Sequence, residues 1–297
     1  HSMIHSSIHR SSHQTNIQDS TGNYLLDTKN CQSCFELTKA DDCKYVYSGF
    51  DVRDIMDIAN TTEAELMYEG MSNGYKAYHV VFSHGVWTSN FIYYSGYIRN
   101  SNHLFGCLDM VKGEYCILNK QYTKKEYDIL ISKIIEKMMT NGEWGEFFPA
   151  NLSPFGYNET VAQEYFPLTK EVALQKGFHW NDYESSKPDV KKIIPAGKLP
   201  DNIADIPNDI LNWAIECEVT KKPFRIIKQE LKLYREYNLP LPRRHPDQRH
   251  HDRMALRNPR KLWDRNCMKC QKAIKTTYAP ERPEIVYCEE CYLKEVY

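Results

Sequence analysis

Short apolar runs recur at nearly regular intervals through the first 120 residues of the chain. Successive runs begin 9 to 13 residues apart. Most are rich in aromatic or β-branched residues, and Gly, Asn, Asp or Ser lies between them, which is typical of short strands separated by turns. The runs begin at Cys34, Cys43, Asp54, Leu66, Ala77, Asn90, His103 and Cys116.

Every second interval gives a period of about 20 to 26 residues, and periods of this length indicate a solenoid. Because the repeating units are strands without helices, we predict a parallel β-helix-like solenoid over residues 1–122, in a chain that is mainly β with some α. Stacked coils protect one another's apolar faces, which a single coil cannot bury alone. An antiparallel sandwich or meander, whose turns recur at similar spacing, is the alternative.

An amphipathic helix is predicted to follow the last coil and cap the solenoid. Thr123 and Glu126 have the spacing of a capping box, in which hydroxyl and carboxylate accept hydrogen bonds from free backbone amides. Apolar residues then share one helix face until Asn141-Gly142 ends it. Residues 143–180 are dense in aromatic residues, so residues 123–180 are expected to be a capping helix and an aromatic strap.

The rest of the chain is predicted to form a linker and two small domains. Residues 181–200 are mostly polar with three prolines, which is typical of a linker. Within residues 201–265 we expect one helix that starts at Pro207 and another over 227–237. Residues 266–297 are expected to be a small α+β ribbon.

Four cysteines near the C-terminus have the spacing of a metal site. Each Cys-x2-Cys pair suits a tight turn whose thiolates converge, and two such turns complete a closed tetrahedral shell. This arrangement predicts one structural zinc ion, with iron as the competing metal. The predicted ligands are Cys267, Cys270, Cys288 and Cys291.

A similar pattern lies upstream, with three of its four ligands replaced. Cys217 occupies the first position, and Thr220, His245 and Gln248 stand where the other cysteines would be. We interpret this segment as a module that has kept its fold and lost its metal. A site formed by Cys217 and His245 and completed by His250 or His251 is the alternative.

The net charge of −1 hides an uneven distribution of charge. Residues 217–265 hold 14 Lys and Arg against 6 Asp and Glu, a net charge of +8, and the remaining residues carry −9. A helix through this region would align basic residues, so we predict a surface for nucleic acid or an anionic protein. Internal ion pairs are the alternative. The predicted contact residues are Arg243, Arg244, Arg249, Arg253, Arg257, Arg260 and Lys261.

Several classes of protein have no support in the sequence. We find no Walker loop, GxGxxG, HExxH or GxSxG motif. Asp51, Asp54 and Asp57 give a catalytic alternative. No apolar run is long enough for a membrane span, and the N-terminal residues do not form a secretory signal. The cysteines suggest no disulfide framework, so we expect a cytoplasmic protein. The chain begins without Met, and we expect the solenoid to be N-terminally incomplete.

Three stretches resemble a family of zinc-ribbon and repeat-scaffold proteins of candidate-phyla bacteria. They are YCILNKQYTKKEYDIL, GEFFPANLSPFGYNETVAQEYFPLT and KPFRIIKQELKLYREYNLPLPRRHPDQRHHDRMALRNPRKLWDRNCMKC. The resemblance implies the order repeat scaffold, capping segment and zinc modules, and no activity. It also implies a complete upstream four-cysteine module, from which this chain departs at Thr220, His245 and Gln248.

These observations predict a non-enzymatic zinc-binding scaffold with a surface for nucleic acid or another anionic partner. The alternative is a carbohydrate-binding or carbohydrate-active β-helix in which zinc is purely structural. That alternative requires an aromatic and acidic groove along one face of residues 34–118.

Overall fold

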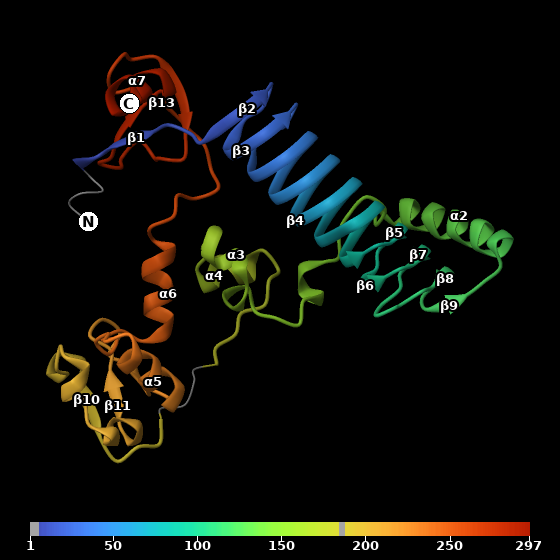
Figure 1. Cartoon of the computed structure of the whole chain (residues 1–297). Helices are drawn as coiled ribbons and strands as arrows, with labels where there is room; N and C mark the ends of the chain where they lie inside the picture. Colours follow the sequence, from blue (N-terminus) through green and yellow to red (C-terminus); the bar gives the residue numbers. More distant parts are fainter. Residues whose placement is uncertain (1–5, 184–187) are drawn as a thin grey trace. The chain divides into compact units, whose positions relative to one another are not determined.

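The computed structural model describes residues 6–183 and 188–297. The chain is mainly strands with some helices (Figure 1), and it divides into two compact units. One unit holds the solenoid and the C-terminal ribbon, and the other holds residues 155–258. No helix among the described residues combines the length and apolar character needed to cross a membrane.

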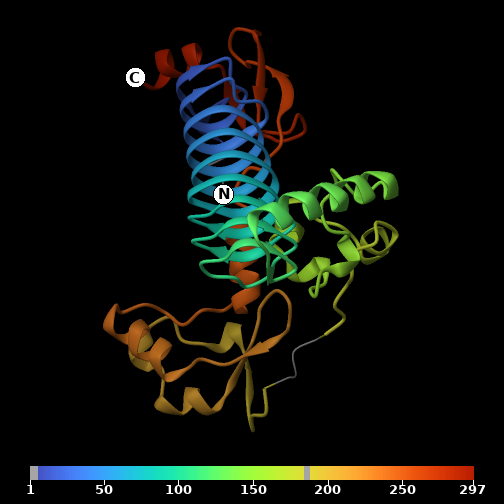
Figure 2. The same ribbon diagram turned by 90° about the vertical axis from the view of Figure 1, so that its right-hand side faces the viewer.

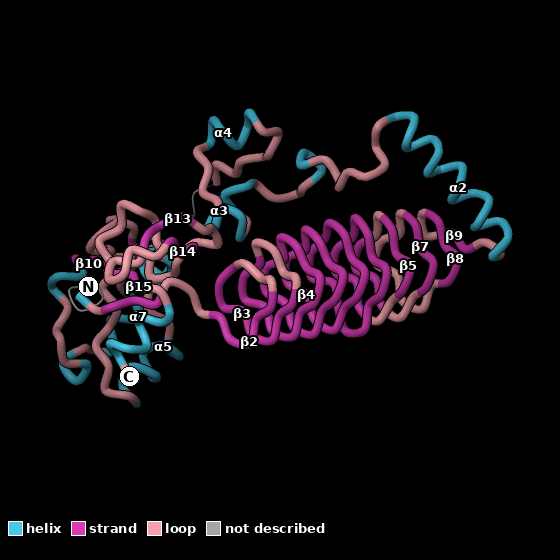
Figure 3. The backbone as a smooth tube through the Cα atoms, turned by 90° about the horizontal axis from the view of Figure 1, so that it is seen from above, coloured by secondary structure: helices cyan, strands magenta, loops and turns pink. Residues whose placement is uncertain are grey.

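The first unit contains the predicted parallel β-solenoid (Figure 3). It has about nine coils. Parallel pairing joins Gly22 to Cys34, and then Asn90 to Asn102 and Asn102 to Glu114, so one coil takes 12 residues. The strands are β2 (Gln14–Gln18), β3 (Gly22–Lys29), β4 (Cys34–Trp87), β5 (Asn90–Tyr93), β6 (Gly96–Arg99), β7 (Asn102–Phe105) and β8 (Glu114–Ile117).

The predicted period of 20 to 26 residues is therefore wrong, because each single interval between apolar runs is a whole coil. The coil is short because its backbone turns at every third residue. Asp51, Asp54 and Asp57 adopt the left-handed conformation with φ of 55°, 54° and 56°. The residue after a corner points inward, as Ile55 does after Asp54 and Ile58 does after Asp57, and both are 1% exposed.

Left-handed corners explain the many Asp, Asn and Ser residues between the apolar runs. For most L-residues this conformation costs about 1–2 kcal/mol, and Asn and Asp tolerate it better than bulky residues. The stacked backbone hydrogen bonds and the buried interior offset this cost along the solenoid. Each coil thus has four sides of three residues, and one residue per side points inward.

The inward residues fill the interior by compensating for one another's size. A Cβ atom on Gly49 would lie 2.7 Å from Cδ2 of Leu37 in the neighbouring coil, so glycine makes room for leucine. The hydroxyl groups of inward serines form hydrogen bonds with the backbone. The Ser83 hydroxyl donates to the carbonyl of Val81 at 2.8 Å and accepts from the amide of Ser95 at 3.0 Å.

The last coil is closed at its open edge in two ways. The short strand β9 (Lys120–Gln121) pairs antiparallel with β8. The Asn119 side chain accepts from the amide of Leu108 at 2.8 Å and donates to its carbonyl at 2.9 Å, as a further strand would. Pairing of exposed edges limits unwanted strand addition.

The predicted capping helix is α2 (Lys124–Asn141). Thr123 and Glu126 form the capping box, and Gly142 ends the helix in the left-handed conformation with φ of 72°. The apolar face of α2 packs on outward aromatic residues of the last coils, among them Phe82 and Tyr94. Trp144 continues this contact, with its ring centroid 5.9 Å from that of Tyr94, so the first part of the predicted strap lies on the solenoid.

The second unit contains two short helices, then a small sheet and two further helices. The elements are α3 (Val161–Tyr165), α4 (Lys170–Gln175), β10 (Ile193–Pro195), β11 (Ala214–Glu216), β12 (Pro223–Phe224), α5 (Lys228–Glu236) and α6 (Pro246–Met254). Helix α5 matches the helix predicted over 227–237.

Two local predictions for this unit need correction. The helix predicted from Pro207 is only a 3-10 turn over Asn208–Asn212, because the chain then enters β11, which pairs with β10 and β12. The C-terminal part of the predicted linker, from Ile193 onward, is also part of the folded domain. Strand β10 pairs in parallel with β11, and Ala196 and Leu199 are buried in the same apolar core.

The C-terminal ribbon, residues 263–297, belongs to the same unit as the solenoid. It consists of β13 (Trp263–Asn266), β14 (Ala273–Thr276), β15 (Ile285–Tyr287) and α7 (Glu289–Val296). Strand β1 (Ile8–Arg10), from the other end of the chain, pairs in parallel with β15 and extends the ribbon (Figures 1 and 2). The ribbon is thus tied to the segment that enters the first coil.

Candidate metal centre and the module upstream of it

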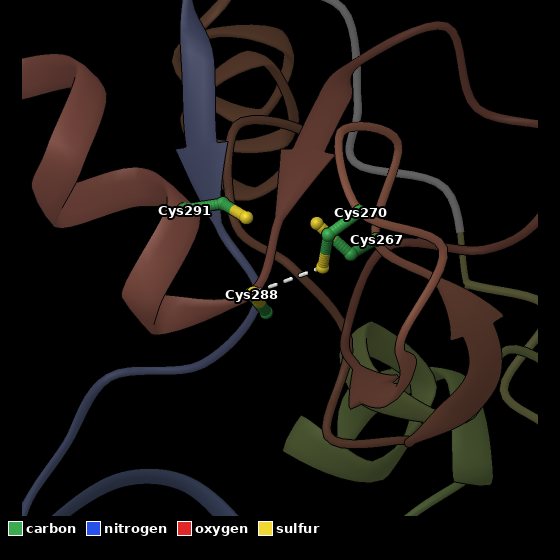
Figure 4. Close-up of side chains that lie close together, drawn as sticks. All are labelled: Cys267, Cys270, Cys288 and Cys291. Carbon is green, nitrogen blue, oxygen red and sulfur yellow. Dashed lines mark hydrogen bonds between the residues drawn. The ribbon is translucent and has the colours of Figure 1, made fainter.

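The four cysteines predicted as ligands converge in the ribbon (Figure 4). Their sulfur atoms all lie within 4.8 Å of one another, and Sγ of Cys270 is 3.7 Å from Sγ of Cys288. Cys267 and Cys288 are buried, Cys291 is half-buried and Cys270 is exposed.

Two tight turns bring the thiols together. Cys267 follows β13. Its carbonyl accepts a hydrogen bond from the amide of Gln271 at 2.9 Å, and its amide donates to the carbonyl of Lys272 at 2.8 Å. Gln271 completes the turn in the left-handed conformation with φ of 62°. Cys288 is the N-terminal cap of α7, and Cys291 lies one turn later on the same helix.

Backbone amides favour the thiolate form of Cys267. Burial opposes ionisation, but hydrogen bonds from the backbone of Cys270, Cys288 and Lys269 outweigh it and lower the pKa of Cys267 to about 6. Burial and the three neighbouring thiols raise the pKa of Cys291 to about 12. Four thiols this close cannot all ionise without a cation, because the thiolates would repel one another.

The spacing of the sulfurs suits a tetrahedral metal ion. A Zn–S distance of about 2.3 Å in a tetrahedron places sulfurs about 3.8 Å apart, close to the 3.7 Å between Cys270 and Cys288. All four positions of the shell would be filled by the protein, which leaves none for a substrate or an activated water. The site can therefore hold a metal ion in a structural role.

The upstream module, residues 214–254, repeats the backbone of this site. The carbonyl of Cys217 accepts a hydrogen bond from the amide of Lys221 at 3.1 Å, and the amide of Cys217 donates to the carbonyl of Lys222 at 3.1 Å. Cys267 forms the same two bonds in the ribbon. Lys221 is left-handed with φ of 60°. His245 is the N-terminal cap of α6, as Cys288 is of α7, and Gln248 follows three residues later.

The thiol of Cys217 also keeps the surroundings of a metal ligand. Burial opposes its ionisation, but hydrogen bonds from Thr220 and from the backbone of His245 lower the pKa of Cys217 to about 7. Thr220, His245 and Gln248 thus stand at the positions of Cys270, Cys288 and Cys291, as the sequence predicts.

Ion pairs and an apolar core stabilise the upstream module. Arg244 contacts Glu218 at 2.6 Å and Asp252 at 2.8 Å, and the Gln248 amide donates to Asp252 at 2.8 Å. Among the described residues, only the four cysteines of the ribbon bring three or more metal-binding atoms together. The alternative site completed by His250 or His251 is therefore not formed, and His250 contacts Glu164 instead.

The predicted row of basic residues on one helix is not formed. Helix α6 ends at Met254, and Pro259 follows within five residues, which disfavours helical backbone at the residue before it. Arg257, Arg260 and Lys261 therefore lie outside the helix.

Most of the predicted nucleic-acid contacts interact with neighbouring side chains of their own unit. Arg243 pairs with Asp201 at 2.6 Å, and Arg260, which is 16% exposed, pairs with Glu36 of the solenoid at 2.7 Å. Arg244 contacts Glu218 and Asp252. Arg249 donates to Tyr234 at 3.4 Å, and Arg257 donates to Tyr165 at 2.6 Å. Lys261 lies 5.1 Å from the ring of Trp263, and Arg253 is exposed.

The aspartates considered for catalysis are not brought together. Asp51, Asp54 and Asp57 occupy three successive corners of one coil, so they face different sides of the solenoid. One side carries a concave surface of about 530 Å³, lined by acidic and basic side chains with Tyr78 as its one aromatic residue.

Two features of the first unit were missed by sequence reasoning. The inward stack of Cys31, Cys34 and Cys43 would have been visible once a 12-residue spacing was assumed, since Cys31 and Cys43 are one coil apart. The addition of β1 to the ribbon had no sequence signal. Comparisons of the chain with protein-family models and with curated proteins gave no match.

Proposed function

We propose that the protein is a non-enzymatic binding scaffold in which a zinc ion holds the ribbon together. The convergence of four sulfur atoms within 4.8 Å carries the zinc part of this proposal. A closed shell of four thiolates is the donor set that zinc prefers in structural sites. Zinc then stabilises the fold and takes no part in a reaction.

The position of the ribbon links the metal site to the start of the solenoid. Strand β1 pairs with β15 in register from Ile8–Ile285 to Arg10–Tyr287. Arg10 also pairs with Glu289 at 2.5 Å, next to the ligand Cys288. A metal that fixes β15 and α7 therefore also fixes the strand that leads into the first coil.

The long solenoid supports a role in binding, because stacked coils present an extended outer surface. An anionic partner, either nucleic acid or protein, is the partner class that the basic segment suggests. Internal pairing of Arg243, Arg244 and Arg260 reduces the charge available for that partner. Arg253 on α6 is the exposed residue that best suits such a contact.

The carbohydrate alternative has less support. That alternative requires an aromatic and acidic groove along one face of residues 34–118, and the concave surface holds a single aromatic residue, Tyr78. Its five carboxylates are mixed with three cationic side chains, Lys39, Arg53 and Lys76. We therefore place the binding role first.

We further propose a cytoplasmic location and membership of the zinc-ribbon family that the sequence resembles. None of the ten cysteines forms a disulfide, which fits a reducing compartment. The order of solenoid, capping helix, upstream module and ribbon agrees with the order that the resemblance implies.

Metal analysis of the natively purified protein tests the zinc proposal. We expect one zinc per chain by native mass spectrometry and elemental analysis. Cys270→Ser should lose or strongly weaken the metal, and Cys217→Ser, a matched control in the upstream module, should keep it. A wild-type protein with no metal, or with iron, would refute the zinc proposal.

A further inference from the structure

One side of the solenoid combines a shallow floor with two charged columns. The floor consists of the small inward residues Ala40, Val52, Ala64 and Ala77, and the concave surface above it has a volume of about 530 Å³. The columns flank the floor because the residues before and after each inward residue point outward. Neighbouring coils place equivalent residues about 4.8 Å apart.

The two columns carry opposite charges in three successive coils. Each of these coils presents one acidic and one basic side chain across the floor, and the order alternates from coil to coil. Asp41 is half-buried and the other five side chains are exposed. The pairs are Asp27 with Lys29, Lys39 with Asp41, and Asp51 with Arg53.

These six charged groups form no ion pair within the part of the chain that the structure describes. None of them lies within 4.0 Å of an oppositely charged group of another described residue, although ion pairs are formed elsewhere in the same unit. Asp27 accepts a hydrogen bond from Asn16 and Lys39 lies 5.5 Å from the ring of Phe50. Helix α2 packs on aromatic residues such as Phe82 and Phe105, which belong to other columns, so it does not cover this side.

We propose that this side is a contact surface for a second copy of the chain. A two-fold axis parallel to the solenoid axis would place each column of one copy opposite the other column of its partner. At each height, the charge on one column would then meet the opposite charge of the partner's column. Lys39 would face Asp41 of the partner subunit, and the symmetry would repeat that contact.

The arrangement also explains where the surface ends. The next coil presents Glu63 and Glu65, which would face each other with like charge, so complementarity is confined to three coils. Exposed ion pairs are individually weak and screened by salt. The dimer is therefore expected to be of modest affinity and to dissociate as the ionic strength rises.

Alternation along a column could instead stabilise neighbouring coils of one chain. The two explanations predict different outcomes when the acidic and basic residues of one coil are exchanged. The double variant K39E/D41K places three acids in one column and three bases in the other, which removes alternation along the columns. It keeps opposite charges across the floor, and therefore keeps complementarity between two copies.

The experiment is sedimentation equilibrium of the zinc-loaded full chain at low and high salt. We expect a salt-sensitive wild-type dimer, and dimers weaker by about tenfold or more for K39E and for D41K, because each reversal creates two repulsive contacts. K39E/D41K should dimerise like the wild type. An equimolar mixture of K39E and D41K should form heterodimers, because Glu at 39 then meets Lys at 41 in one contact and Asp41 meets Lys39 in the other.

Circular dichroism and one zinc per chain verify that each variant is folded. A wild-type chain that stays monomeric at low salt would overturn the proposal. So would single reversals that dimerise normally, or a mixture of K39E and D41K that forms no heterodimer.

Discussion

At the residue scale, the fold depends on two properties that recur at every third position: the backbone conformation of the corner residue and the side-chain size of the inward residue. The corner residues tolerate positive φ, and the inward residues fit a narrow interior, in which Gly49 lies against Leu37. For this reason the apolar pattern predicted the solenoid but not the length of its coil. Inward positions include Ser, Thr, Gly and Ala as well as Ile and Leu, so the three-residue repeat does not stand out as an alternation of hydrophobic and polar residues.

A substitution at one corner tests this account. Asp54→Val should lower the free energy of unfolding by about 1–2 kcal/mol, because a β-branched residue is poorly suited to φ of 54°. Met56→Val, at an exposed extended position of the same coil, is the control and should change stability little. Equal effects of the two substitutions in urea unfolding would contradict the left-handed corner.

The proposed anionic partner is also tested by a single residue. Arg253→Ala should weaken binding to nucleic acid and reduce the salt dependence of the affinity by about one phosphate contact. Arg243→Ala, which removes a residue paired with Asp201, is the control and should change the salt dependence less. Absence of salt-dependent binding by the wild type would rule out nucleic acid as the partner.

At the element scale, local signals in the sequence identified helices where the cap and the apolar face agreed. The capping box and Gly142 fixed both ends of α2. Residues 207–216 gave a helical signal as well, but β11 pairs with strands on both sides. Pairing between strands distant in sequence outweighs a short helical propensity.

Helix α2 provides a prediction at this scale. Thr123→Ala should destabilise the first unit by about 1 kcal/mol, since it removes the hydroxyl that accepts from the amide of Glu126. Thr140→Ala, at the other end of the helix, is the control and should have a smaller effect. Thermal unfolding followed by circular dichroism measures both.

The upstream module provides a second prediction at the element scale. Because its turn and helix cap match those of the ribbon, the triple variant T220C/H245C/Q248C should bind a second metal ion with Cys217. The variant T220C alone supplies too few ligands and should bind none there. A triple variant with unchanged metal content would show that the two backbones differ more than their hydrogen bonds indicate.

At the scale of the whole molecule, the ribbon unites the two ends of the chain. The sequence could predict the metal ligands, because their spacing is local and symmetric. It could not predict that Ile8 pairs with Ile285, since such a contact depends on where the solenoid brings the N-terminal segment. The sequence also could not show that Arg260 is held by Glu36 rather than free for a partner.

The central claim is that zinc bound by four cysteines holds the ribbon and its added strand β1 together. Hydrogen exchange with and without a chelator, on protein of known metal content, tests it most directly. We predict one zinc per chain, and loss of protection on zinc removal both in residues 263–297 and in β1, while the central coils stay protected. Unchanged protection in both segments after metal removal, or a native protein without zinc, would contradict the claim.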